Sequence, residues 1–106
     1  MIELNVKFQE QYKRLDALCK DLFSSKDGVT AYIAEMERNS YSRYRYRIYN
    51  WDSTIEQLKR LRHIRNQLAH DVGAFDYDLC THADIEWLNS FYDLILNIND
   101  PLARIK

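Results

Sequence analysis

The sequence predicts an all-α fold, with four helices in an up-and-down bundle that occupies residues 1–106 as a single domain. Hydrophobic residues make up 46% of the chain, which is enough for one core. Glycine (2) and proline (1) are too scarce for the corners of an all-β fold. Four segments repeat apolar residues at steps of three and four, the spacing of one helix face. A length of 106 residues fits one domain.

The first two helices are expected over residues 3–23 and about 29–39. One face of the first is lined by Leu4, Phe8, Tyr12, Leu15, Cys19 and Leu22. Residues 24–28 read Ser-Ser-Lys-Asp-Gly, which is typical of a turn. The second helix has Ala31, Ile33, Ala34 and Met36 as its apolar content. The short turn between the two helices fits a bundle.

Residues 41–50 do not follow the helical pattern. Basic and aromatic residues alternate in the order Arg43, Tyr44, Arg45, Tyr46, Arg47. A period of two is typical of a strand, but a lone strand has no partner in a helical domain. An extended connection between the second and third helices is therefore favoured, or pairing with a second copy across a dimer; a helical continuation stays open. The cations of such a run could bind backbone phosphates while its aromatic rings stack on bases. Alternatively, the run could be a solvated or dimer-contacting segment.

The third and fourth helices have recognisable starts. Ser53 with Glu56 fits a capping box, with Asp52 as an alternative cap, and this helix should run to about His70. Thr81 with Asp84 fits a second box, and the fourth helix should run to about Ile98, before Asp100 and Pro101. The expected core faces are Leu58, Leu61, Ile64, Leu68 and Val72 on the third helix, and Ile85, Leu88, Tyr92, Ile95 and Ile98 or Asn99 on the fourth.

Arg65 breaks the pattern of the third helix. On a helical wheel it falls inside the apolar arc, between Leu58 and Leu61, while Lys59, His63, Asn66 and His70 form a polar stripe on the other side. A guanidinium cannot be buried unpaired without a large cost. Arg65 must therefore pair with an acid, reach solvent, or line a cavity or interface. The candidate acids are Glu35, Asp84 and Asp93.

The remaining composition excludes several classes of protein. The net charge of −1 means that nucleic-acid binding must come from a local patch. Cys19 and Cys80 lack metal-site spacing and are expected to be buried apolar residues in a reducing compartment. No apolar run reaches the about 20 residues that span a bilayer, so a cytoplasmic location is expected. His63 and His70 lie too far apart along a helix to share an ion, and neither a metal nor a cofactor is expected.

The string Arg65-Asn66-Gln67-Leu68-Ala69-His70 resembles the Arg-polar-x3-His signature of the HEPN domain family. The helical setting, the position of the motif past mid-chain and the chain length agree with this resemblance. It implies a helical bundle that pairs as a homodimer, in which Arg65 and His70, with Asn66 beside them, cleave RNA without a metal. Lys59, Arg62 and His63, on the same helix, would then contribute to RNA binding, together with residues 43–47.

The resemblance also implies a module of toxin–antitoxin or anti-phage type, with a possible cognate antitoxin protein. Members that work with a nucleotidyltransferase antitoxin often carry a tyrosine two residues after the histidine, where this chain has Val72. Regulation by modification of that tyrosine is therefore in doubt. Two alternatives stay open: a HEPN-like dimeric binding or scaffold module without chemistry, and an unrelated bundle in which Arg65 forms a core salt bridge.

Overall fold

The computed structural model describes residues 3–41, 48–70 and 76–105, and within these ranges every regular element is a helix. The all-α prediction is thereby confirmed for the described part of the chain. The elements are α1 (Glu3–Phe23), α2 (Val29–Asn39), α3 (Trp51–His70), α4 (His82–Leu96) and the short α5 (Pro101–Arg104). The predicted bounds of the first two helices agree with the structure. None of the helices in these ranges has the length and apolarity needed to cross a membrane.

The core contains most of the residues of the faces that the periodicity predicts, together with buried residues that it does not predict, such as Tyr32, Trp51 and Phe91. The residues of these faces that are buried are Phe8, Tyr12, Leu15 and Cys19 on α1, Ile33 and Met36 on α2, Leu58, Leu61, Ile64 and Leu68 on α3, and Leu88 and Ile95 on α4. The expected core positions at Leu22, 52% exposed, and at Ile98 or Asn99, both exposed, are wrong. Leu4, Ile85 and Tyr92 are only partly buried. Cys19 and Cys80 are buried as predicted, and burial, aided by Asp16, raises the pKa of the Cys19 thiol to about 12.

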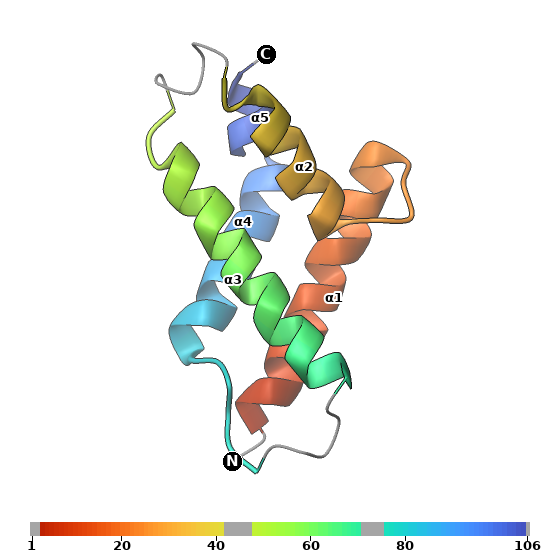
Figure 1. Cartoon of the computed structure of the whole chain (residues 1–106), viewed down its shortest axis with the longest axis vertical. Coiled ribbons are helices and arrows are strands. Elements are labelled where there is room, and N and C mark those ends of the chain that lie inside the picture. Colours follow the sequence, from red (N-terminus) through yellow and green to blue (C-terminus); the bar gives the residue numbers. More distant parts are fainter. Residues whose placement is uncertain (1–2, 42–47, 71–75, 106) are drawn as a thin grey trace.

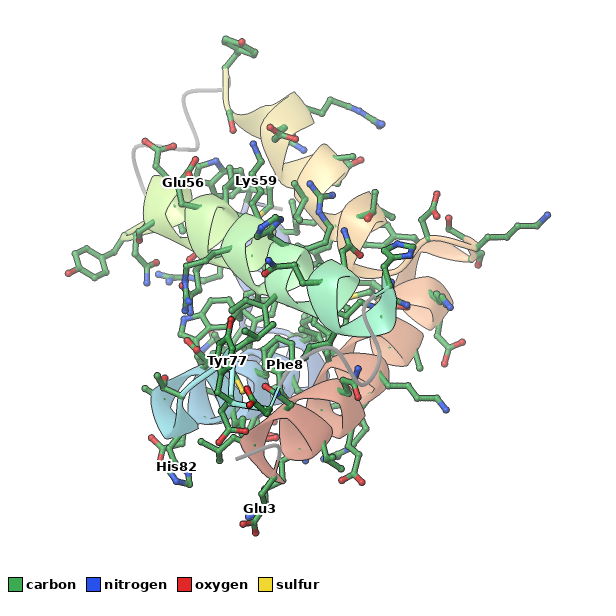
Figure 2. All side chains as sticks on the ribbon, turned by 60° about the horizontal axis from the view of Figure 1, so that its bottom comes forward. Glu3, Phe8, Glu56, Lys59, Tyr77 and His82 are labelled. Atoms are coloured by element: carbon green, nitrogen blue, oxygen red, sulfur yellow. The ribbon has the colours of Figure 1, made fainter. Side chains whose placement is uncertain are left out.

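The helices do not alternate in direction as an up-and-down bundle requires. Asp78, just before α4, accepts a hydrogen bond from the Leu4 N–H at 3.1 Å, so α1 and α4 begin at the same end of the molecule. Phe23 and Ile95, close to the ends of these two helices, line one hollow at the opposite end. Figure 1 shows α1 and α4 rising together while α3 descends across them. In Figure 2, Glu3 and His82 accordingly point into solvent from the same end.

The start of α3 differs from the prediction. The helix begins at Trp51, so Ser53 lies inside it, where its hydroxyl donates to the Asn50 carbonyl at 3.0 Å rather than capping. Trp51 is 2% exposed, and its indole N–H donates to the Ser40 hydroxyl at 3.0 Å. Trp51 thus packs into the core and bonds to Ser40 just after α2, and the helix that carries it begins two residues before Ser53.

The end of the chain also differs from the prediction. The helix α4 ends at Leu96, before Ile98, whose φ of 52° is a left-handed conformation that no helix continues through. Pro101, expected only to stop a helix, instead begins α5. Proline has no N–H to leave unsatisfied in the first turn of a helix, so this position suits it.

The predicted capping box at Thr81 and Asp84 is confirmed, and it yields a pH prediction. The Thr81 hydroxyl accepts from the Asp84 N–H, the Asp84 carboxylate accepts from the Thr81 N–H at 3.0 Å, and Arg60 from α3 pairs with the same carboxylate. Burial alone would raise the pKa of Asp84, but the hydrogen bonds from Arg60 and Thr81 outweigh it and hold the pKa below its usual value. Asp84 therefore joins α3 to the start of α4.

Replacing Asp84 with asparagine should lower the free energy of unfolding by about 1–2 kcal/mol at neutral pH, because a cap and a charged acceptor are removed. A carboxyl whose pKa is lowered on folding stabilises the protein above its unfolded pKa, about 3.9, and stops doing so as the pH falls through its folded value. Urea unfolding between pH 7 and pH 3 should therefore show the difference between wild type and Asp84→Asn shrinking below about pH 4. A difference that stays constant over this range would contradict the assignment.

Candidate functional site

Arg65 lies at the edge of the core, with its guanidinium exposed. Its neighbours Leu61, Ile64 and Leu68 are buried, whereas Arg65 and Asn66 are exposed. The Arg65 Cζ lies 5.9 Å from the centroid of the Tyr12 ring on α1, and its Nη1 donates to the Asn66 Oδ1 at 3.3 Å. The side chain thus covers an aromatic face and ends in solvent, which resolves the conflict that the helical wheel raises.

The core salt bridge, one of the alternatives that the sequence leaves open for Arg65, is not formed among the described residues. Asp84 pairs with Arg60, and Glu35 pairs with Arg38 at 3.0 Å. Within the described ranges Arg65 forms no ion pair, with Asp93 or with any other acid. The interpretation of Arg65 as half of a buried ion pair is therefore wrong for this part of the chain.

Arg65 lines a polar hollow of about 180 Å³ between α1, the start of α2 and α3. Arg62 and Asn66 line it from α3, and the Arg62 Nη1 donates to the Thr30 hydroxyl of α2 at 3.3 Å. Asp16 and Asp27 also line it. The hollow therefore contains both charges, with two fixed cations on one wall.

The start of α2 is held against α1 by a close contact at Gly28. The Asp16 carboxylate accepts the Val29 N–H at 2.9 Å and pairs with Lys20 at 3.3 Å. A Cβ placed on Gly28 would lie 2.1 Å from the Asp16 carbonyl oxygen, so only glycine allows this approach. The contact fixes Thr30, and with it the wall opposite Arg62.

Tyr12 forms the floor of the hollow. Burial, and to a smaller extent the nearby Asp16, raises the pKa of its hydroxyl far above the usual value. Arg65 and Arg62 act in the opposite direction but do not outweigh them. The hydroxyl is therefore protonated at every physiological pH, and it offers a hydrogen bond rather than a charge.

The other predicted site residues on α3 lie apart from this hollow. His70 is the last residue of α3 and is exposed, but it does not line the hollow. His63 is exposed, and Lys59 pairs with Glu37 of α2 at 2.9 Å. The described chain thus brings together Arg62, Arg65 and Asn66 at the hollow and leaves His70 outside it.

The predicted residues Arg43, Tyr44, Arg45, Tyr46 and Arg47 lie outside the described residues, as does Val72. Tyr41 and Tyr49, on either side of the first gap, are 96% and 86% exposed, whereas Ile48 is buried. The predictions of an extended connection and of RNA binding by this run stay predictions.

The sequence does not indicate Thr30, Asp16 and Asp27 as part of the site. They come from α1 and from the turn and first residues of α2, and only the packing of these segments on α3 brings them to Arg65. Gly28 is the one sequence signal, since a lone glycine in a turn marks a special backbone position. Among the described residues, no three His, Cys, Asp or Glu side chains gather in a way that could hold a metal ion.

A family model described as a family of unknown function, DUF6548, matches residues 6–106. The chain belongs to the DUF6548 family. Comparison with curated proteins and with solved structures gave no match. The DUF6548 description names no activity and does not mention HEPN domains, so the activity of this DUF6548 chain has to be inferred from its own residues.

Proposed function

We propose that this DUF6548 chain is a metal-independent endoribonuclease that acts as a homodimer, with its helices arranged as in HEPN domains. The observation that carries the proposal is that Arg65 is exposed beside an open polar hollow and is not neutralised by an acid of the described residues. A permanent cation with a planar donor fork suits phosphate oxygens and the charge that develops when a phosphodiester is attacked.

The proposed reaction assigns one role to each residue of the motif. His70 takes the proton of an RNA 2′-hydroxyl, whose oxygen attacks the adjacent phosphorus, and the resulting imidazolium or a water molecule protonates the 5′-oxygen that leaves. The phosphorus–5′-oxygen bond breaks, and the products are a cyclic phosphate and a 5′-hydroxyl. An imidazole titrates near neutral pH and can serve either step. Arg65 stabilises the negative charge that develops on the phosphoryl oxygens, and Asn66, which already accepts a hydrogen bond from Arg65, orients the guanidinium.

Dimerisation follows from the positions of these residues on α3. Arg65 and His70 lie about 140° apart around a helix, so one α3 does not direct both at the same atom. A two-fold axis beside the end of α3 would combine Arg65 of one protomer with His70 of the other. The homodimer is therefore part of the proposal, and each site is completed by the partner.

RNA affinity is assigned to the cations around this site. Arg62, beside Arg65, is held toward the hollow by Thr30. His63 is exposed, while Lys59 is partly neutralised by Glu37 and should contribute less. Residues 43–47 would add a basic and aromatic segment. A toxin–antitoxin or anti-phage role with a cognate antitoxin partner belongs to the same proposal, which places the chain in the cytoplasm.

The second candidate is a HEPN-like dimeric module that binds RNA or a scaffold partner without cleaving. It is favoured by the distance between His70 and the hollow within one protomer. The two candidates share the dimer and differ in the need for His70.

Incubation of the protein with unstructured RNA oligonucleotides and excess EDTA tests the proposal. We expect cleavage by the wild type to persist in EDTA and to be abolished in His70→Ala. His82→Ala is the matched control, since His82 is equally exposed and lies on α4, and it should cleave like wild type. Binding without cleavage by the wild type would favour the second candidate, and cleavage that EDTA stops would overturn the metal-independent mechanism.

A further inference from the structure

A second hollow, of about 210 Å³, lies between the start of α3, the stretch of α4 from Trp87 to Leu94, and α5. Thr54 lines it, and Arg65 lies about 16 Å further along α3 at the helical rise per residue. Its volume is below the about 300–1,000 Å³ of sites for drug-sized molecules, so it suits a single ring system. The residues that matter chemically are Tyr49, Asn50, Trp87, Phe91, Asn99 and Arg104.

Aromatic rings form one wall of this hollow. Trp87 stacks on Phe91, with ring centroids 5.0 Å apart and planes 8° apart. Phe91 is buried and Trp87 is only partly buried, so Phe91 fixes the indole while Trp87 stays within reach of a ligand. Tyr49, 86% exposed, stands at the mouth. A positioned indole of this kind is a platform on which a planar ring stacks.

Two asparagines, Asn50 and Asn99, line the same hollow as the rings. Among the described residues, neither the Asn50 nor the Asn99 side chain forms a hydrogen bond. Their backbones are nevertheless held: the Asn50 carbonyl accepts the Thr54 N–H at 2.9 Å, and the Asn99 N–H donates to the Leu94 carbonyl at 2.9 Å. Each amide offers two donors and an acceptor, the groups that read the edge of a base.

Arg104 adds a cation from α5. Within the described part of the chain it forms no ion pair. The helix α5 is held against α2 by Tyr32. The buried Tyr32 hydroxyl donates to the Asp100 carboxylate at 2.5 Å and accepts the Leu102 N–H at 3.3 Å. Arg104 is thus an unneutralised guanidinium on a fixed helix at the rim of the hollow.

We propose that this hollow binds one nucleotide. The base stacks on Trp87, Asn50 and Asn99 hydrogen-bond its edge, and Arg104 contacts its phosphate. A nucleotide has a planar ring with polar edges and an attached anion, and these match the aromatic rings, the amides and the cation that line the hollow. Each of these features alone would suit many ligands, but a nucleotide uses all three. The nucleotide is either free or part of a single strand of RNA. This site needs neither Arg65 nor His70, so it stands whether or not the chain cleaves RNA.

The test is titration of the His70→Ala protein, which excludes cleavage during the measurement, with each of the four nucleoside monophosphates and with an unstructured RNA oligonucleotide. Trp87 emission reports binding, because the other tryptophan, Trp51, is buried against Ser40. We expect quenching that Trp87→Phe removes. Asn99→Ala and Arg104→Gln should each weaken binding about tenfold, within the range for removal of a base or phosphate interaction.

Matched controls use residues of the same type outside the hollow. Asn89→Ala and Arg38→Gln are exposed substitutions that should bind like the parent. Binding of monophosphates alone identifies a free nucleotide as the ligand, and binding of RNA alone identifies a base within a strand; both support the site. No quenching by any ligand, or unchanged affinity in Asn99→Ala and Arg104→Gln, overturns it. The EDTA cleavage assay is read separately, so each proposal can fail alone.

Discussion

Replacing Arg65 with alanine is expected to abolish RNA cleavage while leaving the melting temperature close to that of the wild type or above it. The guanidinium is exposed, and its removal leaves no buried carboxylate without a partner. A buried ion pair deprived of its arginine would cost about 3–5 kcal/mol instead. The substitution removes the cation–π interaction with Tyr12, worth about 0.5–1 kcal/mol at an exposed site, and it relieves repulsion between two Arg65 side chains across the proposed dimer.

Thermal denaturation and RNA cleavage, measured on the same samples, test this expectation. Arg14→Ala is a close control, because Arg14 is also exposed and its Cζ lies 4.6 Å from the Tyr92 ring centroid. Arg14→Ala removes a similar cation–π interaction, and the variant should keep full cleavage. If each site combines Arg65 of one protomer with His70 of the other, mixing Arg65→Ala with His70→Ala should restore part of the activity. A large drop in the melting temperature of Arg65→Ala would contradict the structure, and full cleavage by it would contradict the function.

Replacing Gly28 with alanine is expected to destabilise the protein by about 1–3 kcal/mol, the usual cost of forcing an extra group into a packed contact. The new Cβ would meet the Asp16 carbonyl oxygen at 2.1 Å, and this atom belongs to the backbone of α1. The helices α1 and α2 would have to separate, which weakens the Val29 N–H bond to Asp16. Urea unfolding should report the destabilisation as a lower midpoint with an unchanged slope.

Two further variants isolate the cause. Lys26→Ala places the same residue on an exposed position of the same turn and should leave the midpoint unchanged. Asp16→Ala combined with Gly28→Ala should not recover stability, because the closer clash is with the Asp16 carbonyl rather than with its carboxylate. Recovery in the double variant would show that side-chain crowding, and not the approach of the helices, requires glycine.

The sequence predicts the elements that depend on local signals. The bounds of α1 and α2 follow from periodicity and a turn, and the start of α4 follows from the box at Thr81. The elements that depend on tertiary contacts are missed. The helix α3 begins at Trp51, whose ring is buried and bonded to Ser40, and α5 begins where the Asp100 carboxylate accepts a hydrogen bond from Tyr32 of α2. The shared direction of α1 and α4 depends in the same way on Asp78.

The same distinction between local signals and tertiary contacts applies to the candidate site. The motif on α3 draws attention to Arg65, but an ideal wheel places this residue in the core. The structure explains the difference: Arg62 contacts Thr30 in the first turn of α2, so α2 no longer covers α3 at the level of Arg65. The hollow opens there, and its other walls come from residues that carry no motif. Where a neighbouring helix begins is a property of packing, which periodicity in one segment does not report.

The hydrogen bonds at the start of α1 have a consequence for how the chain is made. The Asn5 side chain donates to the Tyr77 carbonyl at 2.9 Å and accepts the Leu79 N–H at 2.7 Å, and Asp78 accepts the Asn5 N–H at 3.2 Å. The first turn of α1 is thus completed by residues that follow it by 72 to 74 positions, so it meets these partners only after α2 and α3 have been synthesised. Closing so long a loop costs entropy that only the finished core repays. The nascent chain should therefore acquire its fold late, after release of the C-terminal helices, rather than helix by helix from the N-terminus.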